Sequence, residues 1–243
     1  MKIIIISDIH SNLEAFEAVL KEVNQIKDVV IYSLGDIVGY GANPIDCIDL
    51  VQKNVTISLA GNHDYAAIGM TSIDNFNPYA KASTVWTANV LSDKDKKYLQ
   101  ELPISEKVAK ITLVHASPTN PLIWEYITNI YDAKKNFLGF NNHLCFIGHS
   151  HRPAIFIKTT DEQYLVGKPD RRLDIKEEYK YFINVGSVGQ PRDGIPLASY
   201  AVYDPEKNTV EIKRVPYDIT VAQEKILEAG LPSYLAERLS YGK

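Results

Sequence analysis

The sequence contains few cysteines and no long apolar segment. Its 243 residues include only two cysteines, Cys47 and Cys145, and neither belongs to a C-x-x-C or other paired motif. A disulfide framework and a zinc ribbon are therefore excluded, and we expect both thiols to be free and buried. No stretch reaches the ~20 apolar residues that a membrane-spanning helix requires.

The N-terminus offers only a short apolar run. Residues 3–6 are isoleucines, and Asp8 follows almost at once. This pattern predicts a buried strand and not the longer apolar region of a signal peptide. We therefore expect a cytoplasmic protein without a membrane partner.

The sequence also has no excess of basic residues. The chain has 26 Lys and Arg against 30 Asp and Glu, and its net charge is −4. Binding to nucleic acid through phosphate neutralisation is therefore disfavoured. An anionic substrate could still be attracted by bound cations, because metal ions are often the largest local charges in a site.

Strand and helix patterns alternate in the first quarter of the chain. Strands are predicted at residues 2–7, 29–34 and 55–60, and helices at 12–25 and 44–53. Asn12 is a candidate N-cap for the first helix, and Pro44 suits the first turn of the second. This order predicts a parallel sheet with right-handed crossovers.

The remainder of the chain is mostly helical at first and rich in strands later. Residues 64–101 are expected to be mostly helical, with a short helix at 131–139, a helix capped by Asp218 and another at 232–239. Further strands are expected at residues 108–115, 144–148, 154–159, 163–166, 181–185, 197–203 and 210–215. Turn residues between the later strands favour antiparallel hairpins. We expect one domain, residues 1–243, built from two sheets with outer helices.

The histidines are the most informative residues. Five of the six lie in four short polar segments, and a fifth segment, Gly35-Asp36, adds a carboxylate. The segments are Asp8-Ile9-His10, Gly61-Asn62-His63-Asp64, Val114-His115-Ala116 and Gly148-His149-Ser150-His151. Most follow a predicted strand, and residues at the carboxyl ends of parallel strands converge. Two pairs, Asp8 with His10 and His149 with His151, are spaced so that an extended backbone would aim both side chains to one side.

This inventory predicts a metal centre. Five histidines, two aspartates and one asparagine exceed what a single tetrahedral zinc ion uses, and they suit two divalent ions with mixed nitrogen and oxygen ligands. A shared carboxylate can hold such ions roughly 3.5–4 Å apart. His143 has no comparable motif around it, and we assign it no role.

These segments, in this order, resemble the motifs of the calcineurin-like metallophosphoesterase superfamily: D-x-H, G-D, G-N-H-D/E, H and G-H-x-H. The later β-rich part, including Asn184-Val185-Gly186-Ser187, is similar to the small bacterial and archaeal phosphodiesterase branch. The resemblance implies an α/β fold, a four-layer α/β/β/α sandwich of two mixed sheets. It also implies that the helical insert at about residues 65–101 lies near the active site.

The resemblance further implies a ligand set. One metal ion would be held by Asp8, His10, Asp36 and His151, and the other by Asp36, Asn62, His115 and His149. Asp36 would bridge two divalent ions, which could be Mn, Fe, Ni, Co or Zn. A hydroxide between them would attack phosphorus in line, with Asn62 orienting the phosphate. His63 would stand off the metals and stabilise charge or protonate the leaving oxygen.

The chain departs from the protein phosphatases of this superfamily beside Asp36. Their G-D-x-V-D-R-G block becomes Gly35-Asp36-Ile37-Val38-Gly39-Tyr40-Gly41. Gly39 replaces the Asp that would orient the catalytic histidine, so what orients His63 is left open. Tyr40 replaces an Arg that would grip a dianionic monoester, so a diester is favoured.

Four residues are candidates for contacting the substrate. Arg192 in a Gly- and Pro-containing loop either clamps the substrate or forms a structural ion pair, and Tyr40 takes the place of the phosphatase Arg. Trp124 and Tyr126 lie in a loop-like stretch and could stack a base. A small phosphorylated or nucleotide-like substrate is expected, and a homo-oligomer is possible.

Several functions remain open beside a phosphodiesterase. The alternatives are a phosphomonoesterase or protein phosphatase, a dinucleoside polyphosphate hydrolase, and a non-catalytic interaction scaffold on the same fold. Scaffold members typically lose a metal ligand or the catalytic histidine, whereas this chain retains all seven ligand positions and His63.

Overall fold

A computed structural model describes residues 1–243, and its strands form two six-stranded sheets. The first sheet has the order β3 (Ile57–Ser58), β2 (Val29–Ser33), β1 (Lys2–Ile6), β11 (Ala198–Asp204), β12 (Thr209–Val215) and β9 (Leu173–Asp174). The second has the order β4 (Ser105–Val108), β5 (Ile111–Val114), β6 (Leu144–Ile147), β10 (Lys180–Asn184), β7 (Ala154–Lys158) and β8 (Tyr164–Val166). Both sheets are mixed: β1 is parallel to β2 and antiparallel to β11, and β10 is parallel to β6 and antiparallel to β7.

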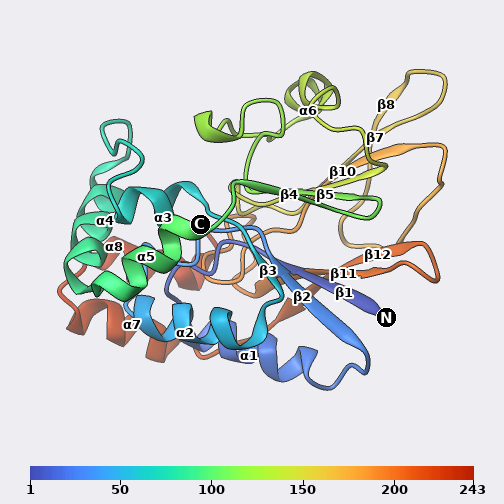
Figure 1. Cartoon of the computed structure of the whole chain (residues 1–243). Helices are drawn as coiled ribbons and strands as arrows, with labels where there is room; N and C mark the ends of the chain where they lie inside the picture. The colour runs from blue at the N-terminus through green and yellow to red at the C-terminus, as the bar shows by residue number, and fades with distance from the viewer.

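Helices cover the outer faces of both sheets. Below the first sheet in Figure 1 lie α1 (Leu13–Val23), α2 (Pro44–Asn54) and α7 (Ile219–Glu228), and above the second lies α6 (Ile130–Asn136). At the left end lie α3 (Asn62–Ala67), α4 (Pro78–Val90), α5 (Asp93–Glu101) and α8 (Ser233–Glu237). Two 3-10 turns span Pro121–Ile123 and Arg238–Tyr241. The expected four-layer α/β/β/α sandwich is thus confirmed.

The isoleucines of β1 show how the layers are held together. Successive side chains of a strand point to opposite faces. Ile3 and Ile5 therefore join the core between the two sheets, where Leu113 and Phe146 lie, and Ile4 and Ile6 pack with the α1 side of the first sheet. The sequence of a strand that is buried on both faces is a continuous apolar run, and residues 3–6 form such a run.

The predicted start signals of the helices are confirmed. Asn12 accepts a hydrogen bond from the main-chain N–H of Ala15 at 3.1 Å, and Asp218 accepts one from Val221 at 3.1 Å. Pro44 is the first residue of α2, where its missing N–H costs no helical hydrogen bond. The β1-α1-β2-α2-β3 unit is parallel as expected, with β2 paired to both β1 and β3.

Two parts of the secondary structure differ from expectation. Residues 108–115 do not form one strand, because the chain turns at Ala109 (φ 49°) and makes the antiparallel hairpin of β4 and β5. Residues 64–101 form three helices, and the connection between α3 and α4, residues 68–77, is not helical. The turn at Ala109 contains no Gly, Pro, Asn or Asp, so no turn signal marks it. Residues 68–77 do carry loop signals, from Gly69 to Asn77 before Pro78.

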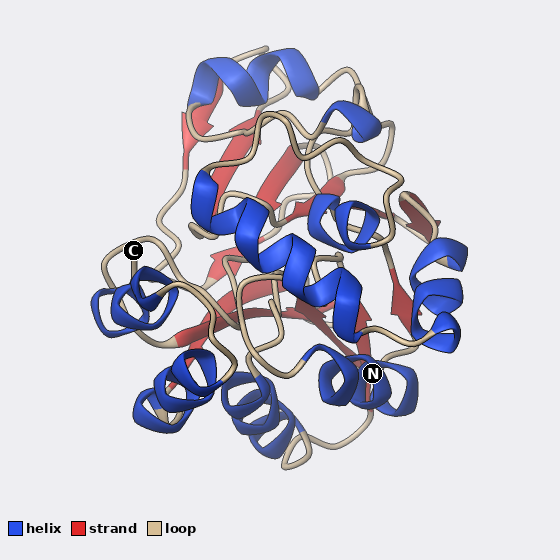
Figure 2. Ribbon diagram, turned by 90° about the vertical axis from the view of Figure 1, so that its left-hand side faces the viewer, coloured by secondary structure: helices blue, strands red, loops and turns tan.

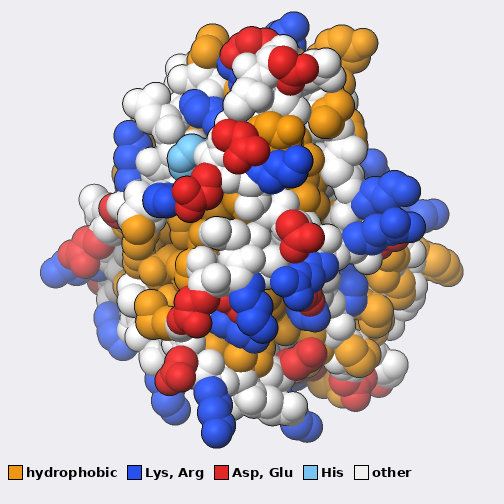
Figure 3. Space-filling model, turned by 90° about the vertical axis from the view of Figure 1, so that its right-hand side faces the viewer, with side chains coloured by type: hydrophobic (Ala, Val, Ile, Leu, Met, Phe, Trp, Pro, Cys, Tyr) orange, Lys and Arg blue, Asp and Glu red, His pale blue; other side chains and the backbone are white.

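The ligand-bearing strands end on the same side of the molecule. β1 starts at the N-terminus on the right of Figure 1 and runs towards the left, where α3 and α4 lie. Seen from that side, helices and loops lie in front of both sheets (Figure 2). No helix combines the length and apolar character needed to cross a bilayer. On the opposite side, basic and acidic side chains are interspersed over most of the face (Figure 3).

Candidate metal centre

Seven polar side chains meet where five strands end. Asp8 and His10 follow β1, Asp36 follows β2, and Asn62 begins α3 just after β3. His115 follows β5 directly, and His149 and His151 follow β6. The convergence expected from the strand pattern is therefore present in the structure.

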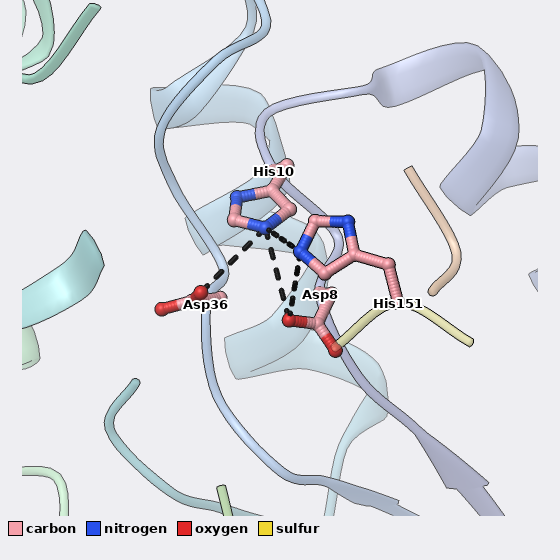
Figure 4. A group of neighbouring side chains, drawn as sticks. All are labelled: Asp8, His10, Asp36 and His151. Atoms are coloured by element: carbon pink, nitrogen blue, oxygen red, sulfur yellow. Dashed lines mark hydrogen bonds and ion pairs between the residues drawn. The ribbon is translucent and has the colours of Figure 1, made fainter. Parts of the chain in front are cut away.

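Four of these residues form one potential metal site. The ligand atoms of Asp8, His10, Asp36 and His151 lie within 4.8 Å of one another, and all four residues are buried. The side chains point towards one centre from three separate loops (Figure 4). The Nε2 atoms of the two histidines are 3.0 Å apart, and His151 Nε2 is 3.3 Å from Asp8 Oδ1.

A second potential site shares Asp36 with the first. Asp36, His115 and His149 also place their ligand atoms within 4.8 Å of one another. His115 Nε2 lies 3.3 Å from Asp36 Oδ2 and 3.2 Å from Asn62 Oδ1, so the asparagine joins this group. Asp36 therefore belongs to both groups.

The hydrogen bonds of the histidines show that the site fits cations. His10, His115 and His151 each donate a hydrogen bond from Nδ1 to a main-chain carbonyl, at 3.0, 3.1 and 2.6 Å respectively. A carbonyl can only accept, so in the neutral imidazole Nε2 keeps its lone pair. The facing Nε2 atoms of His10 and His151 are then both acceptors. Asp36 Oδ2 and His149 Nε2 are buried without any hydrogen-bond partner. A cation between these acceptors would satisfy them together.

Burial favours the neutral, metal-binding form of three of the four ligand histidines, and His115 is the exception. Burial lowers the pKa of His10 and His151 well below the usual value and that of His149 to about 3. Burial also opposes charge on His115, but attraction to Asp36 outweighs it and raises the His115 pKa to about 9. Likewise, burial would raise the pKa of Asp36, but nearby imidazoles hold it well below its usual value. Without another cation, the His115 proton thus compensates the Asp36 charge.

The backbone of the ligand loops is not extended, which corrects the expectation from the i, i+2 spacing. Five ligand residues have positive φ values: Asp8 (54°), His10 (51°), Asp36 (53°), His149 (63°) and His151 (58°). Such conformations are uncommon for residues other than glycine. Each costs about 1–2 kcal/mol and persists only where the surroundings hold it. The side chains converge because the loops coil back, not because the strands continue.

His63 belongs to neither ligand group. Its main-chain N–H donates to Asp36 Oδ1 at 2.8 Å, but the ring nitrogen Nδ1 is buried and has no hydrogen-bond partner. The ring packs against those of His10, Tyr40 and Phe76, with centroids 5.0, 4.5 and 4.9 Å away. Packing against rings therefore orients His63, and burial lowers its pKa to about 4.

The position of Gly39 shows why an Asp at this residue could not orient His63 in place of the neighbouring rings. Its φ is +94°, and a Cβ built on it would lie 2.8 Å from His63 Nδ1 and 3.1 Å from the ring Cγ. The imidazole thus occupies the space that an Asp at this position would need. The open question of what orients His63 is answered by the three neighbouring rings.

Two residues near the site escaped the sequence analysis. Asp64 is fully buried and accepts hydrogen bonds from the main-chain N–H groups of Val38 (3.0 Å) and Gly61 (2.9 Å), which ties the Asp36 loop to the Asn62 loop. Burial raises the pKa of Asp64 to about 7. The position of Asp64 in the G-N-H-D segment could have identified it as a site residue. Phe76 lies in the non-helical connection and carried no periodic signal.

All four predicted substrate-contacting residues lie around the site. The Arg192 guanidinium lies 5.4 Å from the ring centroid of Tyr40 and donates to Gln190 Oε1 from Nη2 (2.7 Å) and Nε (3.2 Å). Arg192 makes no ion pair, which disfavours the structural alternative. Tyr126 stacks on His149 with centroids 4.0 Å apart, and Trp124 meets His115 edge-on at 5.8 Å.

A cavity of about 350 Å³ opens beside these residues. Asn62, His63 and His149 form part of its wall. Two segments supply most of the remainder: the connection between α3 and α4, and residues 123–126. The other lining residues are Tyr40, Thr71, Ser72, Asn75, Phe76, Asn77, Ala80, Ile123, Trp124 and Tyr126. A substrate bound at the ligand groups would therefore extend into a space of small-molecule size.

Comparisons with known proteins agree on one family. Residues 1–208 match the family model for the calcineurin-like phosphoesterase superfamily domain. An uncharacterised protein of Methanocaldococcus jannaschii is 44% identical over 246 residues, covering 99% of this chain and 98% of that protein. The crystal structure of a metallophosphoesterase from Sphaerobacter thermophilus matches with a TM-score of 0.87 and 43% identity, covering 100% of this chain and 99% of the other. A hypothetical protein of Pyrococcus horikoshii shares the fold, with a TM-score of 0.80, 21% identity and coverage of 100% and 98%.

Proposed function

Because this chain belongs to the calcineurin-like phosphoesterase superfamily, we propose that it is a dinuclear-metal-dependent phosphodiesterase. The observation that carries this proposal is the shared position of Asp36, whose carboxylate belongs to both groups of potential ligands. The family assignment supports hydrolysis of a phosphoric ester. The preference for diesters rests on the residues around His63.

The proposed ligand sets follow the two groups. Asp8, His10, Asp36 and His151 would hold one divalent ion, and Asp36, Asn62, His115 and His149 the other. When bound, such a pair of ions lowers the pKa of a water molecule and neutralises phosphate oxygens. The protein supplies neutral imidazoles with Nδ1 anchored on carbonyls, which fixes the direction of each Nε2.

His63 and Asn62 would act on the substrate from the protein side. Both line the cavity, and His63 is held by its ring contacts within reach of the same space. With its pKa lowered to about 4 by burial, His63 is neutral at pH 7. A neutral imidazole acts by hydrogen bonding, so this favours stabilisation of the phosphoryl group over supply of a proton from an imidazolium.

The residues that replace the phosphatase Asp and Arg favour a diester. Gly39 leaves no room for an orienting carboxylate, and Tyr40 offers a ring where a phosphatase has a guanidinium. Arg192 is the one guanidinium over that ring, and Gln190 already engages its Nε and Nη2 atoms. Its capacity to grip a dianionic monoester in bidentate fashion is reduced.

The proposal is tested by metal analysis together with a substrate panel. Purified protein should contain close to two divalent ions per chain by inductively coupled plasma mass spectrometry. With either Mn²⁺ or the native metals, it should hydrolyse a generic diester faster than a generic monoester, a dinucleoside polyphosphate or a phosphopeptide. A clear preference for the monoester would overturn the interpretation of Gly39 and Tyr40. Metal-loaded protein that hydrolyses none of them would favour the scaffold alternative. One domain over residues 1–243, a cytoplasmic location and a homo-oligomer stay predictions.

A further inference from the structure

The cavity beside His63 has no charged wall. None of its thirteen lining residues is Asp, Glu, Lys or Arg. Burial of an unpaired charge is costly, so the part of a substrate that enters this space is uncharged. Because His63, Asn62 and His149 line the same space, that part lies directly beside the reacting phosphate.

The two segments that line the cavity differ in chemistry. The connection between α3 and α4 contributes hydroxyl and amide side chains, namely Thr71, Ser72, Asn75 and Asn77. These groups both donate and accept hydrogen bonds, as the edge of a nucleobase requires. The other segment contributes Ile123, Trp124 and Tyr126, which are apolar or aromatic. A flat group suits both segments if its face is apolar and its edge both donates and accepts hydrogen bonds.

The aromatic residues leave specific groups unused. Tyr126 is 54% exposed and stacks on His149 with an interplanar angle of 20°. No other ring stacks on Tyr126, and the residue lines the cavity. The indole N–H of Trp124 is buried and has no hydrogen-bond partner.

A guanidinium and the second ligand group adjoin the part of the cavity wall formed by Tyr40 and His149. Arg192 lies over Tyr40, and His149 belongs to that group. The negative charge of a substrate belongs there, and its neutral part belongs in the cavity. An inorganic polyphosphate is charged throughout and does not fit this division. A volume of about 350 Å³ lies at the lower end of the roughly 300–1,000 Å³ of small-molecule pockets. That volume suits one nucleoside rather than an oligonucleotide.

We infer that this cavity binds the base and sugar of a nucleoside whose phosphodiester is hydrolysed at the neighbouring metal centre. The inference rests on the proposed phosphodiesterase function and narrows its substrate to nucleotide esters. Tyr126 stacks on the base, and Asn75 contacts its edge. Both are substrate-binding residues in this assignment.

The test compares two diesters with the same leaving group. Nucleoside 5′-(p-nitrophenyl phosphates) of the four common bases are set against methyl p-nitrophenyl phosphate, so that any difference in kcat/KM reports the nucleoside. At least one nucleoside ester should be preferred. Tyr126→Ala should reduce that preference about tenfold, the scale of one base–aromatic contact. Asn75→Ala should change the ranking of the bases. Asn141→Ala alters an exposed asparagine outside the site and should leave both the preference and the ranking unchanged.

Binding of free nucleosides separates this inference from the proposed function. Isothermal titration calorimetry with the four uncharged nucleosides should show binding to wild-type protein that weakens in Tyr126→Ala, even if no ester is hydrolysed. Metal content is measured in each variant, because Tyr126 contacts His149. Hydrolysis of the methyl ester without any preference for nucleoside esters would overturn the inference and leave the phosphodiesterase proposal standing. Nucleoside binding without hydrolysis of any ester would overturn the phosphodiesterase proposal and leave the nucleoside-binding site standing.

Discussion

Replacement of Gly39 tests how His63 is positioned. In Gly39→Ala, the new Cβ would lie 2.8 Å from His63 Nδ1 and 3.1 Å from both the Cβ and Cγ atoms of the histidine. These distances are shorter than normal van der Waals contact. The ring cannot retreat freely, because Tyr40 and Phe76 pack against it at 4.5 and 4.9 Å. We expect His63 to be displaced from its place beside the ligand groups.

The expected magnitude has two parts. A residue other than glycine at φ +94° costs about 1–2 kcal/mol of backbone strain. For a chain of this size, each kcal/mol lowers Tm by roughly 2–4 °C, so a fall of about 2–8 °C is expected. Displacement of His63 should also lower kcat/KM for a diester by about 10²–10³-fold, the usual cost of losing one hydrogen-bond donor to the developing charge.

Gly69→Ala is the matched control. Gly69 also has a positive φ, +76°, but a Cβ there would meet no atom within 4 Å. Both variants carry a similar backbone cost, and Gly39→Ala should lose more thermal stability, measured by calorimetry, because only its Cβ meets neighbouring atoms. Only Gly39→Ala should lose activity, measured on metal-loaded protein with a chromogenic diester. Gly39→Asp should be no more active than Gly39→Ala, because the imidazole already occupies the space that the carboxylate would need.

Two results would refute this reasoning. If Gly39→Ala kept the activity of Gly69→Ala, the contact with His63 would not position the ring for the reaction. If Gly39→Asp were more active than wild type, an aspartate–histidine pair would be possible here, and packing of His63 by aromatic rings would be the wrong explanation.

The other site residues give further measurable outcomes. Asp36→Asn removes the charge shared by both ligand groups, so metal content should fall well below that of wild type by mass spectrometry; two retained ions would contradict a bridging role. His63→Ala keeps the main-chain contact to Asp36, so it should retain its metals and lose about 10²–10³-fold in kcat; undiminished hydrolysis would contradict its catalytic role. Arg192→Ala should raise KM for a diester by about tenfold, because a charge-assisted hydrogen bond contributes about 1.5–3 kcal/mol, and an unchanged KM would remove it from the site. Added Mn²⁺ at about 100 times its Kd should stabilise the protein by roughly 2.7 kcal/mol, and calorimetry showing no rise in Tm would argue against binding to the folded state.

The convergence of the ligand side chains could be predicted from the sequence. Asp8, Asp36 and His149 each come after a run of apolar residues, and the carboxyl ends of neighbouring parallel strands meet. The layered arrangement could also be predicted, because the isoleucines of residues 3–6 indicate a strand that is buried on both faces. In both cases a periodic or contiguous pattern carries the information.

The positions that escaped prediction lie where the chain has no period. Residues 105–114 form a hairpin through a turn at Ala109, a residue type that signals no turn. Phe76 packs on His63 from a connection whose sequence shows neither helical nor strand spacing. Gly39 could be recognised as a departure from the phosphatase motif. Its meaning depends on a contact across the fold, because His63 fills the space beside it.

Hydrogen bonds within the protein hold the strained backbone of the ligand loops. Asp8 and His10 are strained at φ 54° and 51°, and such residues persist only when their surroundings over-determine them. The surroundings do so here through hydrogen bonds between loops. Asp8 donates from its main-chain N–H to Gly35 O at 3.0 Å, and His10 does the same to Asp36 O at 3.0 Å. Asp64 adds two more links by accepting from the N–H groups of two neighbouring loops. All these bonds lie within the protein, and the acceptors that they leave unpaired, Asp36 Oδ2 and His149 Nε2, are atoms that an ion would satisfy.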